Sequence, residues 1–142
     1  MAYRRHLSRT IKNKLNAHKV EYDGFVFGSK KEAMRWAELK LEAKAGRITD
    51  LDRQVPFELI PAQYEEIPTG EFYKRGEKKG QPKVKRVCIE KDVTYVADFV
   101  YMKDGKKVVE DTKGCKEGIT YNYFVLKRKM MLYVHGIRIR EV

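Results

Sequence analysis

The sequence contains few of the cysteines and histidines that stabilise small domains through disulfides or bound metals. It has only two cysteines, Cys88 and Cys115, and neither belongs to a C-x-x-C motif or to a zinc-type Cys/His spacing. We therefore expect reduced thiols in a cytosolic protein. The three histidines, His6, His18 and His135, are scattered along the chain and support neither a histidine metal site nor a nucleophilic triad.

Long hydrophobic runs are also missing. The longest apolar stretch near the C-terminus, residues 130–134, is far shorter than a membrane span, and no N-terminal stretch resembles a signal peptide. We therefore expect no membrane partner and a cytoplasmic location. The length of 142 residues suits one domain with a hydrophobic core of its own.

Acidic residues are absent from the first twenty positions, although the whole chain has 20 of them against 31 lysines and arginines, a formal net charge of +11. Positive charge is concentrated in blocks, which favours a polyanion partner because neutralised phosphates release counterions. A solvated basic surface would give the same composition. The candidate nucleic-acid-binding residues are Arg4, Arg5, Lys74, Arg75, Lys78, Lys79, Lys83, Lys85, Arg86 and Lys127.

The order of the elements predicts an α/β fold. A capping box, Ser29 with Glu32, begins a predicted helix that ends at Gly46. A second helix is predicted from Thr120 to Gly136. Alternating apolar residues predict the strands, and a turn signal joins two of them as a hairpin. The predicted strands are residues 53–62, 92–102, 107–113 and 137–140. The expected core is therefore α-β-β-β-α-β, with a mixed central sheet flanked by helices.

The chain divides into two unequal parts on this interpretation. Residues 1–20 are expected to form a basic, flexible N-terminal arm. Residues 21–142 are expected to form the domain, interrupted by a basic insertion or flexible hairpin at about 64–88, where no hydrophobic period is visible.

Two acids and a lysine stand out where the strand at 107–113 ends. Side chains alternate along a strand, so Asp111 and Lys113 share one face and Glu110 points to the other. The hairpin brings Asp98 from the preceding strand close to Asp111. Two adjacent carboxylates repel each other, and Mg²⁺ (or Mn²⁺) would relieve the repulsion through oxygen ligands. The lysine would then orient or deprotonate the attacking water in phosphodiester cleavage.

These motifs resemble those of the PD-(D/E)XK nuclease superfamily. The resemblance rests on Y-V-A-D-F at 95–99, with Ala97 in place of the usual proline, and on D-T-K at 111–113. G-S-K-K-E-A at 28–33 is similar to the first core helix of the superfamily, and Q-V-P-F at 54–57 to a strand of the endonucleases that cut transposon ends. The whole pattern also resembles a family of short uncharacterised phage proteins, over roughly residues 20–140.

The resemblance implies a restriction-endonuclease-like core and a Mg²⁺-dependent DNA endonuclease. Asp98, Asp111, Glu32 and the carbonyl of Thr112 would hold the metal, and Lys113 would complete the catalytic set. Branched DNA in phage recombination or packaging is the leading substrate hypothesis, with a homodimer and the cytoplasm of a bacterial host as further expectations. The alternative is a non-catalytic protein on the same fold that binds DNA or a host protein.

Simpler structural roles compete for several residues. The capping box accounts for Glu32 without a metal. Gln54 could face the site, although an ordinary position on an edge strand is the simpler interpretation, and Glu110 is expected to be solvent-facing or structural. Leu132 is expected in the core, and Lys127 near substrate phosphates.

Overall fold

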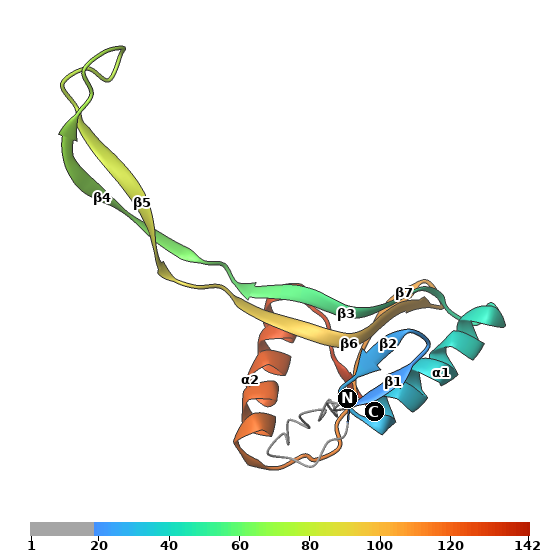
Figure 1. The fold of residues 1–142 in the computed structure, drawn as a ribbon. Coiled ribbons are helices and arrows are strands. Elements are labelled where there is room, and N and C mark those ends of the chain that lie inside the picture. Colours follow the sequence, from blue (N-terminus) through green and yellow to red (C-terminus); the bar gives the residue numbers. More distant parts are fainter. Residues whose placement is uncertain (1–18) are drawn as a thin grey trace, which may run out of the picture.

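The computed structural model describes residues 19–142, in which two helices and eight strands are present (Figure 1). In chain order they are β1 (Val20–Tyr22), β2 (Phe25–Phe27), α1 (Lys30–Lys44), β3 (Thr49–Ile60), β4 (Gln63–Phe72), β5 (Pro82–Glu90), β6 (Val93–Lys103), β7 (Lys106–Asp111), α2 (Gly118–His135) and β8 (Arg140–Glu141). The mixed α/β architecture is confirmed. Most of the predicted arm, residues 1–18, lies outside the described residues. Neither described helix is both long enough and apolar enough to cross a membrane.

The central sheet has the strand order β3-β6-β7-β8. β6 pairs antiparallel with β3 and with β7, and the predicted hairpin turn between β6 and β7 is confirmed at Asp104 and Gly105. Both turn residues have positive φ, as two-residue hairpin turns require. β8 pairs parallel with β7, because α2 carries the chain back before it. The sheet is therefore mixed, as expected.

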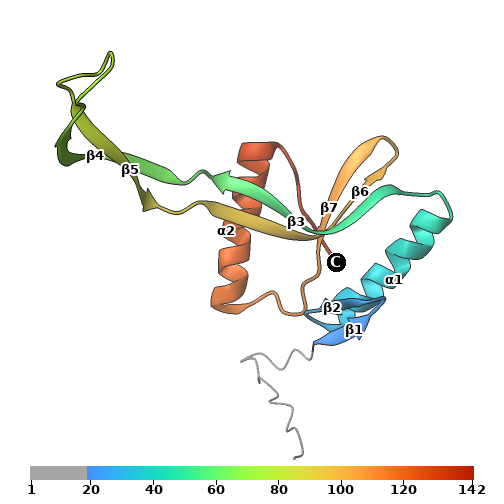
Figure 2. The ribbon, with the colours of Figure 1, turned by 45° about the horizontal axis from the view of Figure 1, so that its top comes forward.

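The two helices pack on opposite faces of this sheet, as Figure 2 shows. Phe99 and Val100 are neighbours on β6 but belong to different cores. Phe99 packs with Trp36 of α1, whose ring stacks on it at a centroid distance of 5.9 Å. Val100 packs with Phe124 and Met131 of α2. The sheet is thus covered on both sides where β6 meets β7.

The start of α1 and the end of α2 agree with the sequence-based prediction, whereas the start of α2 does not. Ser29 caps α1, and its side chain accepts a hydrogen bond from the backbone N–H of Glu32 at 3.1 Å, as predicted. α2 starts earlier than predicted: its N-cap is Glu117, and Thr120 lies within the first turn. α2 ends at Gly136, whose φ of 66° favours glycine.

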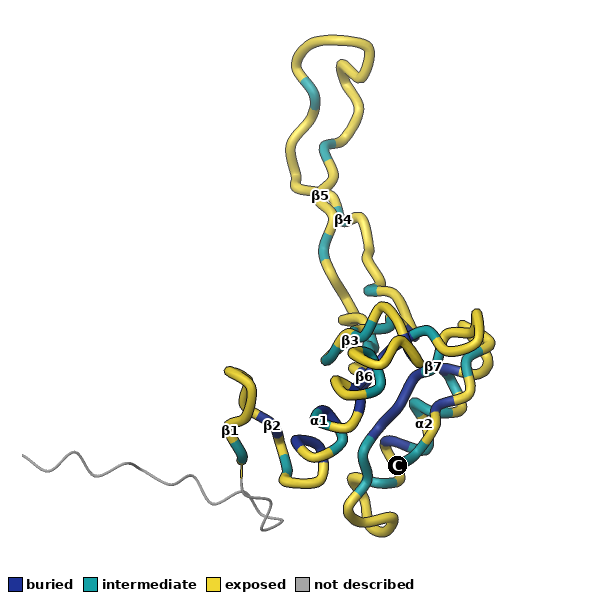
Figure 3. The backbone as a smooth tube through the Cα atoms, turned by 90° about the vertical axis from the view of Figure 1, so that its right-hand side faces the viewer, coloured by how far each residue is buried: buried dark blue, intermediate teal, exposed yellow. Residues whose placement is uncertain are grey.

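The basic insertion is a regular two-stranded ribbon, β4 paired with β5, that extends away from the rest of the structure (Figure 1). Only residues 61–62 separate β3 from β4, and only residues 91–92 separate β5 from β6. The ribbon is exposed along almost its whole length (Figure 3). Its sequence shows no clear period because neither face is buried.

Candidate active site

Asp98 and Asp111 lie next to each other where the pairing of β6 with β7 ends, at the end away from the hairpin turn. The register pairs Phe99 with Glu110, so Asp98 stands beside the end of β7. Asp98 Oδ2 accepts two hydrogen bonds from Thr112, one from its backbone N–H and one from its hydroxyl, both at 2.7 Å. These bonds fix one oxygen of Asp98 and leave Oδ1 for other partners.

Asp111 is buried, and both of its carboxylate oxygens have partners. The hydroxyl of Tyr95 donates to Oδ2 at 2.8 Å, and the ammonium of Lys113 lies 2.5 Å from Oδ1. The same ammonium lies 3.9 Å from the ring centroid of Phe124. Sequence reasoning missed Tyr95, because a strand tyrosine is usually a core residue and only its hydroxyl bond to Asp111 marks it.

Glu32 and Gln54 reach the same place from α1 and β3. Glu32 Oε2 accepts a hydrogen bond from the backbone N–H of Gly28 at 2.9 Å. The side-chain amide of Gln54 lies 3.2 Å from Glu32 Oε1 and 3.4 Å from Asp98 Oδ1. Gln54 also has a φ of 53°, which is uncommon for a non-glycine residue. β3 is an edge strand, but the prediction of an ordinary role for Gln54 is wrong.

The charge of Asp98 affects the protonation of the two buried carboxylates, Asp111 and Glu32. Burial raises the pKa of Asp111, and the charge of Asp98 raises it further, whereas Lys113 and Tyr95 act in the opposite direction. Burial and then the charge of Asp98 also raise the pKa of Glu32. Burial raises the pKa of the Tyr95 hydroxyl, which therefore stays protonated and donates. The site concentrates negative charge away from water, which favours a cation.

The residues fit a hard divalent cation in their chemistry, because they offer carboxylate and backbone carbonyl oxygens. Within residues 19–142, however, no three Asp, Glu, His or Cys side chains form a group ready to hold a metal. Lys113 and Tyr95 already engage Asp111. Magnesium is often held by one or two carboxylates, with waters and substrate phosphates as its other ligands. The site fits an ion bound in that incomplete way.

Glu110 is buried, which decides between the two expected roles: it is structural and not solvent-facing. Arg35 of α1 donates two hydrogen bonds to its carboxylate, both at 2.8 Å, and the Tyr101 hydroxyl donates a third at 2.7 Å. Burial would raise the pKa of Glu110, but these bonds outweigh it and lower the pKa. Alternation along β7 correctly directed Glu110 away from Asp111. The face it occupies is covered by α1, and its role is structural.

An open hollow of about 510 Å³ adjoins Thr112, between the start of α1 and the end of the chain. Its lining includes Lys30, Lys31 and Arg140. The ammonium of Lys31 donates to the carbonyl of Lys113 at 2.8 Å and so ties α1 to the loop after β7. Sequence reasoning missed these cations, because lysines at a helix start are common on solvated surfaces. Positive charge therefore borders the acidic residues directly.

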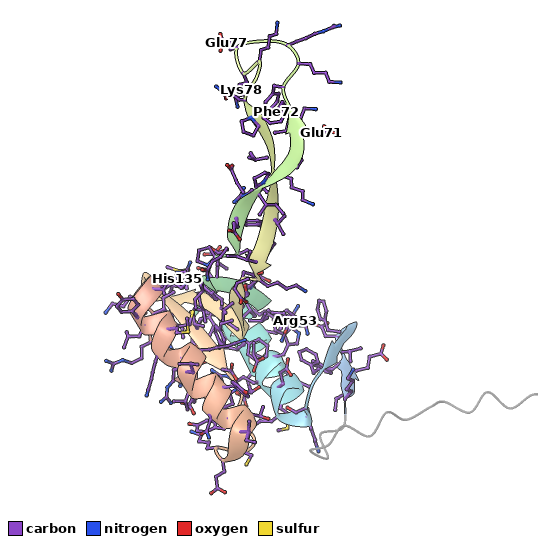
Figure 4. All side chains as sticks on the ribbon, turned by 90° about the vertical axis from the view of Figure 1, so that its left-hand side faces the viewer. Arg53, Glu71, Phe72, Glu77, Lys78 and His135 are labelled. Carbon is purple, nitrogen blue, oxygen red and sulfur yellow. The ribbon has the colours of Figure 1, made fainter. Side chains whose placement is uncertain are left out.

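The ribbon holds most of the predicted nucleic-acid-binding residues. Of these, Lys83 is half-buried and pairs with Glu71 at 3.0 Å. The others are exposed: Lys74, Arg75, Lys78, Lys79, Lys85 and Arg86. Four of these, Lys74, Arg75, Lys78 and Lys79, lie between β4 and β5. Figure 4 labels Lys78 at the far end of the ribbon, so much of the positive charge lies at its tip.

Three of the predicted nucleic-acid-binding residues lie outside the ribbon: Lys127, Arg4 and Arg5. Lys127 of α2 is half-buried, and its ammonium donates to the carbonyl of Thr94 at 2.8 Å. This internal contact explains Lys127 without a phosphate. Arg4 and Arg5 lie outside the described residues, and their role stays a prediction.

Comparisons with known proteins identify a family. A family model described as "Protein of unknown function (DUF1064)" matches residues 12–139. No curated protein and no solved structure matches the chain.

Proposed function

The chain belongs to this family of unknown function, and we propose that it is a metal-dependent DNA endonuclease with a restriction-endonuclease-like core. The observation that carries the proposal is the convergence of Asp98, Asp111 and Glu32 at one place, with the ammonium of Lys113 at 2.5 Å from Asp111. Glu32 and Asp111 are buried, and burying like charges close together costs free energy. Perturbed acids grouped in this way are typical of catalytic sites.

The element order supports the fold part of the proposal. Without the β1–β2 hairpin and the ribbon, the described elements follow the order α1, β3, β6, β7, α2, β8. This is the α-β-β-β-α-β order that the resemblance implies. The acids also stand where the resemblance would have them, on the first helix and on two neighbouring strands.

Each residue of the site has a proposed task. Asp98 and Asp111 would hold Mg²⁺ or Mn²⁺, with Glu32 and the carbonyl of Thr112. When bound, the ion would polarise the scissile phosphate. Lys113, whose ammonium is paired with Asp111, would orient the attacking water and stabilise the negative charge that develops on the phosphate. Tyr95 fixes the orientation of Asp111 through its hydroxyl.

The DNA-binding part of the proposal rests on the ribbon and the hollow. A two-stranded β-ribbon fits the DNA major groove, and the ribbon's exposed cations supply charge for phosphates. Arg86 lies over the ring of Tyr64, 3.9 Å from its centroid, which holds the guanidinium at the ribbon surface. Lys30 and Lys31 would receive phosphates next to the acids. We expect strongly salt-dependent binding with little direct base readout.

Cleavage assays test the proposal directly. Purified protein should cut plasmid, linear or four-way-junction DNA with Mg²⁺ or Mn²⁺, and EDTA should stop the reaction. Asp98→Asn keeps an oxygen to accept from Thr112 and should lower the rate at least about a hundredfold. Asp104→Asn is the matched control, because Asp104 is an exposed turn acid whose φ of 51° suits asparagine. Cleavage that survives Asp98→Asn would contradict the site.

A non-catalytic DNA-binding protein is the second candidate. It is favoured by the lack of a ready three-ligand group within residues 19–142 and by the salt bridge that already neutralises Asp111. It predicts tight, salt-sensitive DNA binding without cleavage of any substrate in either metal. Under that role Asp98→Asn leaves the affinity for DNA unchanged.

A further inference from the structure

The outward face of α2 is apolar along the length of the helix, in a chain whose residues are 36% charged. Side chains spaced four, three, four and three residues apart follow this face: Ile119, Tyr123, Leu126, Met130 and Tyr133. Exposed fractions are 75% for Ile119, 66% for Tyr123, 55% for Leu126 and 92% for Tyr133. Leu132, expected in the core, is 48% exposed as well. We call the first five residues the α2 stripe.

The fold makes little use of the α2 stripe: of its five residues, only Met130 is partly buried against the core. The opposite side of the helix packs on the sheet through Phe124 and Met131, which are buried. α1 provides the contrast, since its exposed surface mixes Met34 and Leu41 with Lys30, Glu38 and other charged residues. A continuous exposed apolar surface of this kind marks an interaction site.

We propose that a second copy of the chain covers the α2 stripe, through an antiparallel pairing of the two α2 helices about a two-fold axis at Leu126. The alternating four- and three-residue spacing is that of helices that pack side by side. About this axis the stripe is self-complementary at three of its five positions. Ile119 and Tyr133 each lie seven residues from Leu126, so in an antiparallel pair each meets the other, and Leu126 meets its own copy.

The charged residues beside the stripe favour a second copy of the chain as the partner and an antiparallel arrangement of the two helices. Lys127 and Arg128 are engaged on the inner side of α2, by Thr94 and Glu141, which leaves Lys129 as the exposed lysine beside the stripe. In a parallel pair Lys129 would lie level with Lys129 and Met130 of the other copy, so it would meet no aromatic ring. In the antiparallel pair Lys129 falls opposite Tyr123 of the other copy, where a cation over an aromatic ring is favourable. An uncharged stripe gives DNA nothing to bind.

The exposed area sets the expected strength. Large side chains present roughly 150–250 Å² each when free, so the α2 stripe offers roughly 500 Å² per copy. A standard interface buries about 800 Å² per partner. We therefore expect a weak dimer, with a dissociation constant on the order of 10 µM. This inference does not depend on the proposed nuclease activity.

The first test measures the mass of the full chain by sedimentation or light scattering, from about 1 µM to about 100 µM around the expected dissociation constant. The mass should rise from 16.7 kDa towards twice that value. Leu126→Glu should keep it at the monomer value, because two glutamates would face each other. Leu41→Glu, at an exposed leucine of α1, is the matched control and should leave the rise unchanged. A wild-type chain that stays monomeric throughout would overturn the proposal.

The second test asks whether the partner is a second copy in the stated direction. Leu126→Glu and Leu126→Lys should each be monomeric alone and should dimerise when mixed. With both native cysteines changed to serine, Ile119→Cys and Tyr133→Cys proteins should form a disulfide-linked pair only when mixed. Cross-linking of Ile119→Cys with itself, or no recovery in the Glu/Lys mixture, would overturn the arrangement.

Discussion

Glu110 and Asp111 are adjacent acids with different assignments, and two nearly isosteric substitutions separate them. Glu110→Gln should destabilise the protein and leave cleavage intact, because Glu110 holds α1 to the sheet through Arg35. Asp111→Asn should leave the protein folded and abolish cleavage. The single tryptophan, Trp36, is buried, so its fluorescence reports urea unfolding for both variants.

The magnitudes follow from the contacts. Glu110→Gln removes the charge from a fully buried carboxylate that accepts two bonds from Arg35, and breaking such a pair costs about 3 kcal/mol, which lowers Tm by about 10 °C. The lower end of the usual range applies because Arg35 is partly exposed and regains water. Asp111→Asn loses the pairing with Lys113 but removes repulsion with Asp98. Because folding raises the pKa of Asp111, its charge does not stabilise the fold, and we expect the free energy of unfolding to change by about 1 kcal/mol or less.

Two results would refute this reasoning. One is the loss of cleavage in Glu110→Gln at a temperature where unfolding curves show it folded. The other is cleavage by Asp111→Asn at the wild-type rate. Either would mean that the two acids have exchanged roles, or that the acidic group is not catalytic.

Three further predictions concern pH, backbone strain and salt. The stability advantage of wild type over Glu110→Gln should be full at pH 7 and disappear as pH falls below the ordinary value of 4.5 and through the lowered pKa of Glu110, in urea unfolding at each pH. Gln54→Gly should raise the free energy of unfolding by about 1 kcal/mol, since glycine accepts the positive φ, and should slow cleavage because the amide is lost; faster cleavage would contradict its role. Lys78→Glu should reduce the salt slope of duplex binding by about 1 in fluorescence anisotropy, whereas Lys106→Glu, at the exposed start of β7, should not change it.

Local patterns predicted the parts of the fold that depend on local physics. The helix at Ser29 and the hairpin turn at Asp104 follow from capping and turn geometry. Lys113 lies close to Asp111 as predicted, but β7 ends at Asp111 and Lys113 belongs to the loop after it. Alternation along the strand directed Glu110 away from Asp111. It could not tell whether water or α1 would cover that face, because the cover comes from a residue 75 positions away.

The rest depends on contacts that no local pattern contains. Gln54 joins the site because β3 lies against β6 and its backbone turns there, and neither fact leaves a mark in the sequence around it. Leu132 has an apolar side chain on a helix, and only the packing of α2 shows which side it faces. The ribbon lacked a visible period because both of its faces meet water.

The ribbon and the acidic group share two continuous stretches of chain. β3, which carries Gln54, runs on as β4, and β5 leads into β6, which carries Asp98. A bend or twist imposed at the ribbon tip therefore reaches both side chains through covalent backbone. The ribbon is therefore coupled mechanically to the two strands that set the spacing of Gln54 and Asp98.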